Sequence, residues 1–153
     1  MNEKLLLSVL HQSPWLGTVK RTEYAIAPLL PQAKQSVQFT RSGQAFTPAK
    51  KKKYVKDLNA FIRASYAAAR MTGPIRVTIL FCFPWRSADS KKKRKDGWAI
   101  MDKRPDVDNL LKPLLDSCSD LTFDDDGQVV TVIATKIRHD DPAIVVKLEE
   151  LEF

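Results

Sequence analysis

The segment that decides the fold is residues 104–130, which read RPDVDNLLKPLLDSCSDLTFDDDGQVV. Pro105 fixes its own φ and disfavours helical backbone at the residue before it. A helix is therefore expected to start near Asp106, with this residue as N-cap, and to reach about residue 118. An acidic turn follows the helix, and the β-branched run over residues 129–137 predicts a strand.

Upstream of this segment, residues 75–83 (IRVTILFCF) predict a buried strand between a Gly-Pro pair and a proline. Apolar residues at spacings of three and four predict a helix over about residues 48–71. Thr47 is a favourable N-cap, Pro48 suits the first helical position, and Gly73 is a natural stop.

The remaining chain completes an α+β (α/β) domain. A first strand is expected over residues 21–28, a long loop over 29–42, and a last strand over 143–153. The order β-α-β-α-β-β predicts a mixed sheet packed with two main helices. Residues 1–20 are interpreted as an N-terminal extension of unknown role, and residues 21–153 as one compact domain.

The composition favours a polyanionic partner. The chain has 25 Lys and Arg against 18 Asp and Glu, a net charge of +7, which favours nucleic acid first and an anionic membrane second. Cys82 and Cys118 lack metal-ligand or redox spacing and are expected to be buried thiols. The apolar run near the N-terminus is too short for a signal peptide or a membrane span, so a soluble cytoplasmic protein is expected.

Two aspartates mark the start of the expected helix at residue 106. Asp106 and Asp108 can converge there because an N-cap side chain folds over the open helix end. Lys112 follows Asp108 by four residues and shares its helix face. The alternative is structural, since the helix dipole favours aspartate here and an exposed Asp108–Lys112 pair contributes only about 0.3–0.5 kcal/mol.

A second acidic cluster, Asp124, Asp125 and Asp126, precedes the strand at residue 129. Adjacent carboxylates repel one another, and a protein of net charge +7 gains no evident stability from two such clusters. Mg²⁺ accounts for both clusters, because this hard cation prefers oxygen ligands from separate segments. The alternative is a solvated acidic turn, because Asp and Gly also favour turns.

Taken together, the D-x-D-N-L-x-K run of residues 106–112 and the D-D-x-Q-V run of residues 125–129 resemble the signature of the RusA-type Holliday-junction resolvases. Asp116 falls where that family carries a helix aspartate. The specific match covers about residues 104–131. Pro113 departs from a regular helix pattern, and the first twenty residues have no counterpart.

The resemblance implies a RusA-like fold and the role of each site residue. It implies that Asp106, Asp108 and Asp126 are essential metal-binding acids and that Lys112 is the essential lysine, with Asp125 as a further candidate ligand. The cofactor implied is Mg²⁺, with Mn²⁺ as a substitute. A homodimer is implied as well, since resolving a junction requires two cuts.

Basic residues border the acidic motif and are candidate DNA contacts. These candidates are Arg86, Lys91, Lys92, Lys93, Arg94, Lys95, Lys103 and Arg104. Such side chains bind phosphates without reading sequence. Trp98 lies among them and is a candidate for stacking on an unpaired base, with a core or interface aromatic as the alternative. For Lys50–Lys53, the alternative to a DNA contact is a solvated helix face.

The sequence thus indicates a Mg²⁺-dependent endonuclease that hydrolyses phosphodiesters of four-way junctions in DNA recombination and repair. Two alternatives remain open. One is a basic DNA-binding protein without catalysis, whose binding would strengthen if the acids were removed. The other is a magnesium nuclease acting on flaps or other branched DNA, which shares the chemistry and differs only in substrate.

Overall fold

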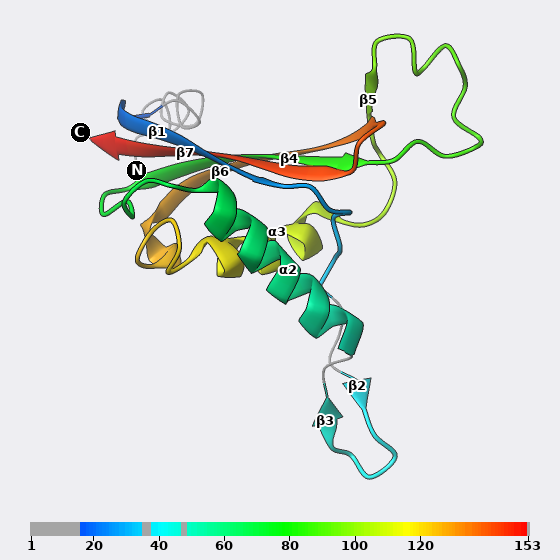
Figure 1. The fold of residues 1–153 in the computed structure, drawn as a ribbon, viewed down its shortest axis with the longest axis horizontal. Helices are drawn as coiled ribbons and strands as arrows, with labels where there is room; N and C mark the ends of the chain where they lie inside the picture. The colour runs from blue at the N-terminus through cyan, green and yellow to red at the C-terminus, as the bar shows by residue number, and fades with distance from the viewer. Residues whose placement is uncertain (1–15, 35–37, 47–48, 153) are drawn as a thin grey trace, which may run out of the picture.

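The computed structural model describes residues 16–34, 38–46 and 49–152 of the chain. Its centre is a mixed five-stranded sheet with the order β1-β7-β4-β6-β5 (Figure 1). The strands are β1 (Thr18–Ala27), β4 (Ile75–Phe83), β5 (Trp98–Ile100), β6 (Val129–His139) and β7 (Ala143–Glu152). The central pair β4 and β6 is parallel, whereas the other neighbours are antiparallel.

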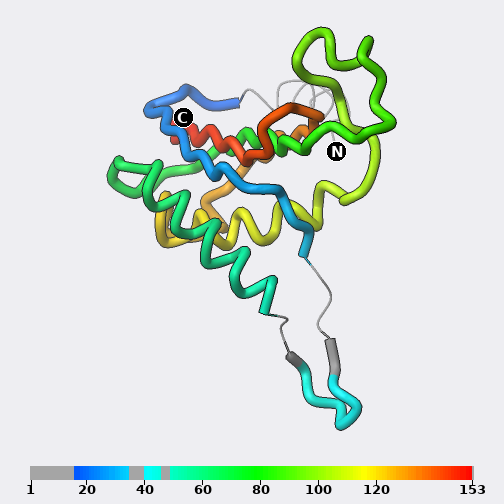
Figure 2. Tube along the Cα trace, turned by 45° about the vertical axis from the view of Figure 1, so that its right-hand side comes forward, coloured from blue at the N-terminus to red at the C-terminus, as the bar shows by residue number. Residues whose placement is uncertain are grey.

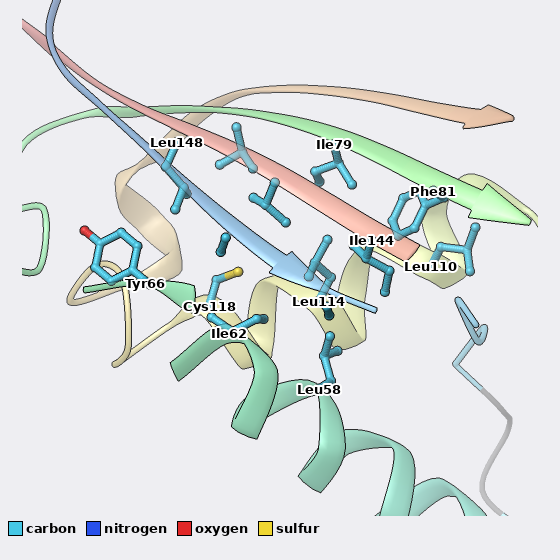
Figure 3. Close-up of a cluster of buried hydrophobic side chains, with 14 of the residues drawn as sticks. Leu58, Ile62, Tyr66, Ile79, Phe81, Leu110, Leu114, Cys118, Ile144 and Leu148 are labelled. Carbon is cyan, nitrogen blue, oxygen red and sulfur yellow. The ribbon is translucent and has the colours of Figure 1, made fainter. Parts of the chain in front are cut away.

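Two helices cover one face of this sheet, as Figure 1 shows. They are α2 (Ala49–Ser65) and α3 (Val107–Cys118), and they contact each other. Leu58 and Ile62 of α2 meet Leu110 and Leu114 of α3 in a core of buried side chains (Figure 3). Burial of such side chains contributes about 1.5–3 kcal/mol each, so the core fixes both helices on this face.

The mixed five-stranded sheet with two helices on one face confirms the predicted α+β class. Strands β4, β6 and β7 follow the predicted ranges closely, and β1 starts three residues before the expected position 21. Both cysteines are free and buried, as expected, and burial raises the pKa of the Cys118 thiol to about 12. None of the helices in the described part of the chain has the length and apolar character needed to cross a membrane.

The predicted helix over residues 48–71 is too long, because α2 ends at Ser65. The Ser65 hydroxyl donates to the Phe61 carbonyl and accepts from the Ile26 amide at 2.9 Å, which joins the helix end to β1. The chain then leaves the helix, and the Met71 amide donates to the Thr122 carbonyl. Tertiary hydrogen bonds therefore override the helix propensity of the alanines after position 66.

Three short strands were not predicted. Strand β2 (Gln38–Phe39), in the expected loop, pairs with β3 (Ala45–Phe46), just after it, in a small hairpin that extends away from the layers (Figure 2). In the basic segment, β5 pairs with the end of β6. The proposed capping residues Thr47 and Pro48 lie outside the described residues.

The other face of the sheet carries no helix in the described part of the chain (Figure 1). Register places Ile100 of β5 beside Ile137 of β6, and Leu80 of β4 beside Val145 of β7. Ile100 is 65% exposed, and Ile26 of β1 is also exposed at the far side of the same face. We call this the outer sheet face. It is apolar around Ile100, whereas register places the pairs Arg76–Glu149 and Thr78–Lys147 further along the same face.

Candidate active site

Asp106 and Asp108 lie at the start of α3, and both are exposed. Asp106 is the N-cap residue, as predicted, but its side chain makes no cap hydrogen bond, so it does not fold over the helix end. Throughout the described ranges, neither carboxylate has a hydrogen bond or ion pair. Both are therefore available to a ligand beside the positive end of the helix dipole.

Lys112 lies one turn further along α3, where it faces the second acidic segment. Its Nζ is 2.6 Å from Asp116 Oδ1 and 3.8 Å from Asp126 Oδ2. The expected alternative pair with Asp108 is wrong, because Lys112 turns toward the C-terminal half of the helix. The hydrogen bond with Asp116 raises the pKa of Lys112 above its ordinary value, so the side chain is a cation at neutral pH.

The three consecutive aspartates have different surroundings. Asp124 pairs with Arg70 at 3.3 Å, whereas Asp125 accepts a 2.6 Å hydrogen bond from the Gly127 amide and caps the short 3₁₀ turn η2 (Asp126–Gln128). A Cβ at Gly127 would lie 2.8 Å from Asp125 Oδ1, so a side chain there would displace the capping carboxylate from its present position. Capping and pairing thus account for two of these acids, and only Asp126 faces Lys112.

Gln128 positions this acidic turn, a role that sequence reasoning did not assign. Its side-chain oxygen accepts from the amides of Asp124 and Asp125 at 2.8 Å each. Its Nε2 donates to the carbonyls of Met71 and Gly73. One amide side chain therefore joins the turn to the entry of β4, and its place in the D-D-x-Q-V motif was the available signal.

The donor chemistry of the acids fits a hard cation, since exposed carboxylate oxygens are what Mg²⁺ binds. The positions of these acids in the structure, however, fit a single metal ion less well. Over the described ranges, no group of three or more His, Cys, Asp or Glu side chains lies close enough together to hold a metal ion. The structure brings Lys112 to Asp126, but it does not gather Asp106, Asp108 and Asp126 at one point.

The basic segment between β4 and β5 is folded into turns. Asp89 accepts from the Arg86 amide at 2.7 Å, and this bond lowers the pKa of the Asp89 carboxyl. Arg94 donates to the Arg86 carbonyl at 2.7 Å and lies over the Trp85 ring, 5.6 Å from its centroid. Arg94 therefore shapes the loop, while Lys91, Lys92, Lys93 and Lys95 are exposed.

Lys103 and Arg104 are exposed directly before α3. Lys136 of β6 fixes the backbone of the segment that leads into α3, because its Nζ donates to the carbonyls of Lys103 and Pro105 at 2.6 and 2.7 Å. Sequence reasoning missed Lys136, although a lysine within a β-branched strand was a usable signal. Register places it beside the buried Phe81, so its stem lies on the helix-covered face.

Trp98 is 52% exposed and belongs to the outer sheet face. Together with Leu80, Ile100 and Ile137 it lines an apolar depression on that face. This environment is compatible with both interpretations given above, a stacking platform and an interface aromatic.

Comparison with known proteins agrees with the motif. The family described as Endodeoxyribonuclease RusA matches residues 28–149, which is most of the chain. The chain belongs to the RusA family. This confirms the resemblance based on residues 104–131, and the match extends it through β4, α2 and β7.

A bacterial protein and a phage protein are similar to this RusA-family chain. It is 29% identical over 107 residues to the uncharacterized protein YqaN of Bacillus subtilis (strain 168), covering 66% of this chain and 75% of that protein. It is 29% identical over 79 residues to the crossover junction endodeoxyribonuclease rusA of Lactococcus phage r1t. That second match covers 51% of this chain and 56% of the phage protein.

Proposed function

We propose that this protein is a Mg²⁺-dependent endonuclease that resolves four-way DNA junctions in recombination and repair. The observation that carries the proposal is the approach of Lys112, from the D-x-D-N-L-x-K helix, to Asp126 of the D-D-x-Q-V turn at 3.8 Å. Membership of the RusA family supports it. Residues 21–153 would form the nuclease domain, preceded by residues 1–20.

In this proposal the acids bind the cofactor. Asp106, Asp108 and Asp126 would hold the metal ion, with Asp125 as a further candidate through its second oxygen. Bound Mg²⁺ or Mn²⁺ would act as a Lewis acid on the scissile phosphate and on water. Hydrolysis forms a bond between the water oxygen and phosphorus and breaks one phosphodiester P–O bond.

Lys112 would stabilise the negative charge that develops on the phosphate during this step. Its ammonium lies on the exposed surface between Asp116 and Asp126, where it would be available to a bound phosphate. A fixed cation at the reacting phosphate stabilises the transition state more than the ground state. The exposed lysines of the 91–95 loop, with Lys103 and Arg104, would bind the DNA backbone.

Resolution requires two cuts, so we propose a homodimer in which each subunit cuts one strand. The apolar depression on the outer sheet face, lined by Leu80, Trp98, Ile100 and Ile137, supports self-association, because exposed apolar patches mark interaction sites. Ile100 and Trp98 would lie at the centre of this interface. Trp98 would then serve the dimer; its alternative role is stacking on an unpaired base.

The test is to incubate the protein with end-labelled four-way junction, flap and linear duplex in parallel, in Mg²⁺, Mn²⁺ or EDTA. Symmetrical junction cuts in Mg²⁺ and Mn²⁺, absent in EDTA, are expected. Preferred cutting of flaps would assign the other substrate class. Tight binding without cutting in any metal would favour the DNA-binding protein and overturn the proposal.

A further inference from the structure

A cavity of about 270 Å³ lies between the start of α2 and the middle of α3, closed on one side by residues 32–34. Ala33, Tyr54, Val55 and Pro113 give it apolar walls. The polar part of its lining includes Lys34, Lys50, Lys51, Lys112 and Asp116. The lining therefore combines flat apolar surface with an excess of positive charge.

Pro113 explains why residues 32–34 pack against α3 at this cavity. A proline within α3 has no amide to bond the carbonyl of Asn109 four residues earlier. The Lys34 amide takes that place, donating to Asn109 O at 2.6 Å. The Gln32 amide donates to the buried Tyr54 hydroxyl at 3.2 Å. Two hydrogen bonds thus hold residues 32–34 against both helices and shape the cavity.

Lys112 joins the cavity to the candidate active site, because it lines the cavity and lies 3.8 Å from Asp126. A molecule in the cavity would therefore lie next to the phosphate that Lys112 is proposed to contact. The volume is slightly below the roughly 300–1,000 Å³ typical of ligand pockets, which suits a group as small as one nucleotide.

We propose that this cavity binds one unstacked nucleotide of the cleaved strand, beside the scissile phosphate. The base would contact Tyr54, Val55 and Pro113, because apolar and aromatic surfaces stabilise an unstacked base. Lys34 and Lys50 would bind the flanking phosphate. This inference rests on the proposed nuclease function and adds the subsite that positions the strand.

The direct test is photo-crosslinking in EDTA, where the strand remains uncut. A four-way junction carries a single 5-iododeoxyuridine, moved one position at a time across the cleavage site. Mass spectrometry should find an adduct on Tyr54 from one position, or from two adjacent positions. Val55→Phe, which fills the cavity, should remove that adduct. Ala64→Phe, on the exposed side of α2, should leave it.

A second pair of variants tests the phosphate contacts without filling the cavity. The double variant Lys34→Gln/Lys50→Gln should weaken junction binding on the order of tenfold, through two lost phosphate contacts. Lys52→Gln/Lys56→Gln makes the same charge change outside this cavity and should bind more tightly than the first pair. Equal affinities of the two double variants would argue against the lysine contacts.

The outcomes separate this inference from the proposed function. If the protein cuts junctions in Mg²⁺ but no position crosslinks to Tyr54, or if the adduct survives Val55→Phe, the cavity is not a nucleotide subsite. If the protein does not cut junctions, the nuclease proposal fails. The same scan on a single-stranded oligonucleotide then tests the cavity by itself, with the same expected adduct and the same controls.

Discussion

The Lys34 amide donates a 2.6 Å hydrogen bond to the Asn109 carbonyl, which Pro113 leaves without its helical partner. Pro113→Ala would supply an amide within α3 that competes for this carbonyl. Proline costs about 3 kcal/mol relative to alanine inside a helix, so the free energy of unfolding should rise by about 1–3 kcal/mol. Urea denaturation measures this change.

Hydrogen exchange supplies the local readout for Pro113→Ala. The Lys34 amide should exchange faster, because its acceptor is shared, while the Gln32 amide bonded to Tyr54 should keep its protection. A destabilised variant with unchanged protection at Lys34 would contradict this account of the proline.

The acids are tested one at a time by Asp106→Asn, Asp108→Asn and Asp126→Asn. Each should abolish cutting in Mg²⁺ yet leave junction binding intact or tighter, because each removes one negative charge near bound phosphates. Cleavage of labelled junctions and gel-shift titration measure the two effects. Asp124→Asn is the matched control, since its carboxylate pairs with Arg70. Normal cutting by all three variants would place the active site elsewhere.

Elements bounded by strong local signals could be predicted from the sequence. Strand β4 lies between Pro74 and Pro84, and its apolar run leaves no alternative to burial. Helix α3 starts where Pro105 and Asp106 predict it. By contrast, β5 has three residues and exists through its pairing with β6, which no local pattern encodes.

The site could be predicted only in part, for a similar reason. Helical spacing puts both Asp108 and Asp116 one turn from Lys112, and spacing alone cannot choose between them. The choice depends on Asp126, which the fold brings to the C-terminal half of α3. Likewise, Asp125 could not be recognised as a cap from composition, because its partner amide becomes available only in the η2 turn.

Substitutions at Lys112 and at its partner Asp116 distinguish the role of Lys112 in cutting from that of the acids. Lys112→Ala should lower cutting by two to three orders of magnitude, since one preorganised contact contributes about 3–4 kcal/mol in a transition state. Lys112→Arg should not fully restore it, because guanidinium presents its charge in a plane. Single-turnover cleavage measures these rates.

Asp116→Asn is the control for the ion pair of Lys112. It removes the partner at 2.6 Å and keeps the lysine, so cutting should remain much closer to wild type than in Lys112→Ala. Stability should change little in either variant, because exposed pairs contribute about 0–1 kcal/mol. A Lys112→Ala enzyme that cuts within a few-fold of wild type would return this residue to a surface role.

The basic loop predicts a salt effect. Replacing Lys91, Lys92, Lys93 and Lys95 with alanine should flatten the fall of junction affinity with salt, by about 0.9 logarithmic units per lost phosphate contact. Arg94 is kept because it lies over Trp85 and shapes the loop. Binding titrations over a range of salt concentrations measure the slope, and an unchanged slope would assign these lysines to a solvated loop.

If the outer sheet face forms the proposed dimer interface, a charged substitution on it should dissociate the dimer. Ile100→Arg places a charge on a side chain that is 65% exposed, beside Ile137, so folding of the subunit should be preserved. If this face joins two subunits, sedimentation equilibrium should change from the mass of two chains toward that of one, because an unpaired buried charge is costly. Paired junction cuts should give way to single nicks.

Val130→Arg is the matched control for Ile100→Arg. Val130 is also an exposed apolar residue, at 56%, but it lies at the irregularity where the β4–β6 register shifts and does not line the depression around Ile100. Its replacement should therefore leave the mass and the paired cuts unchanged. If Ile100→Arg keeps the mass of two chains, the subunits associate through another surface. If wild type itself has the mass of one chain in the presence of junction DNA, the two-subunit mechanism is wrong.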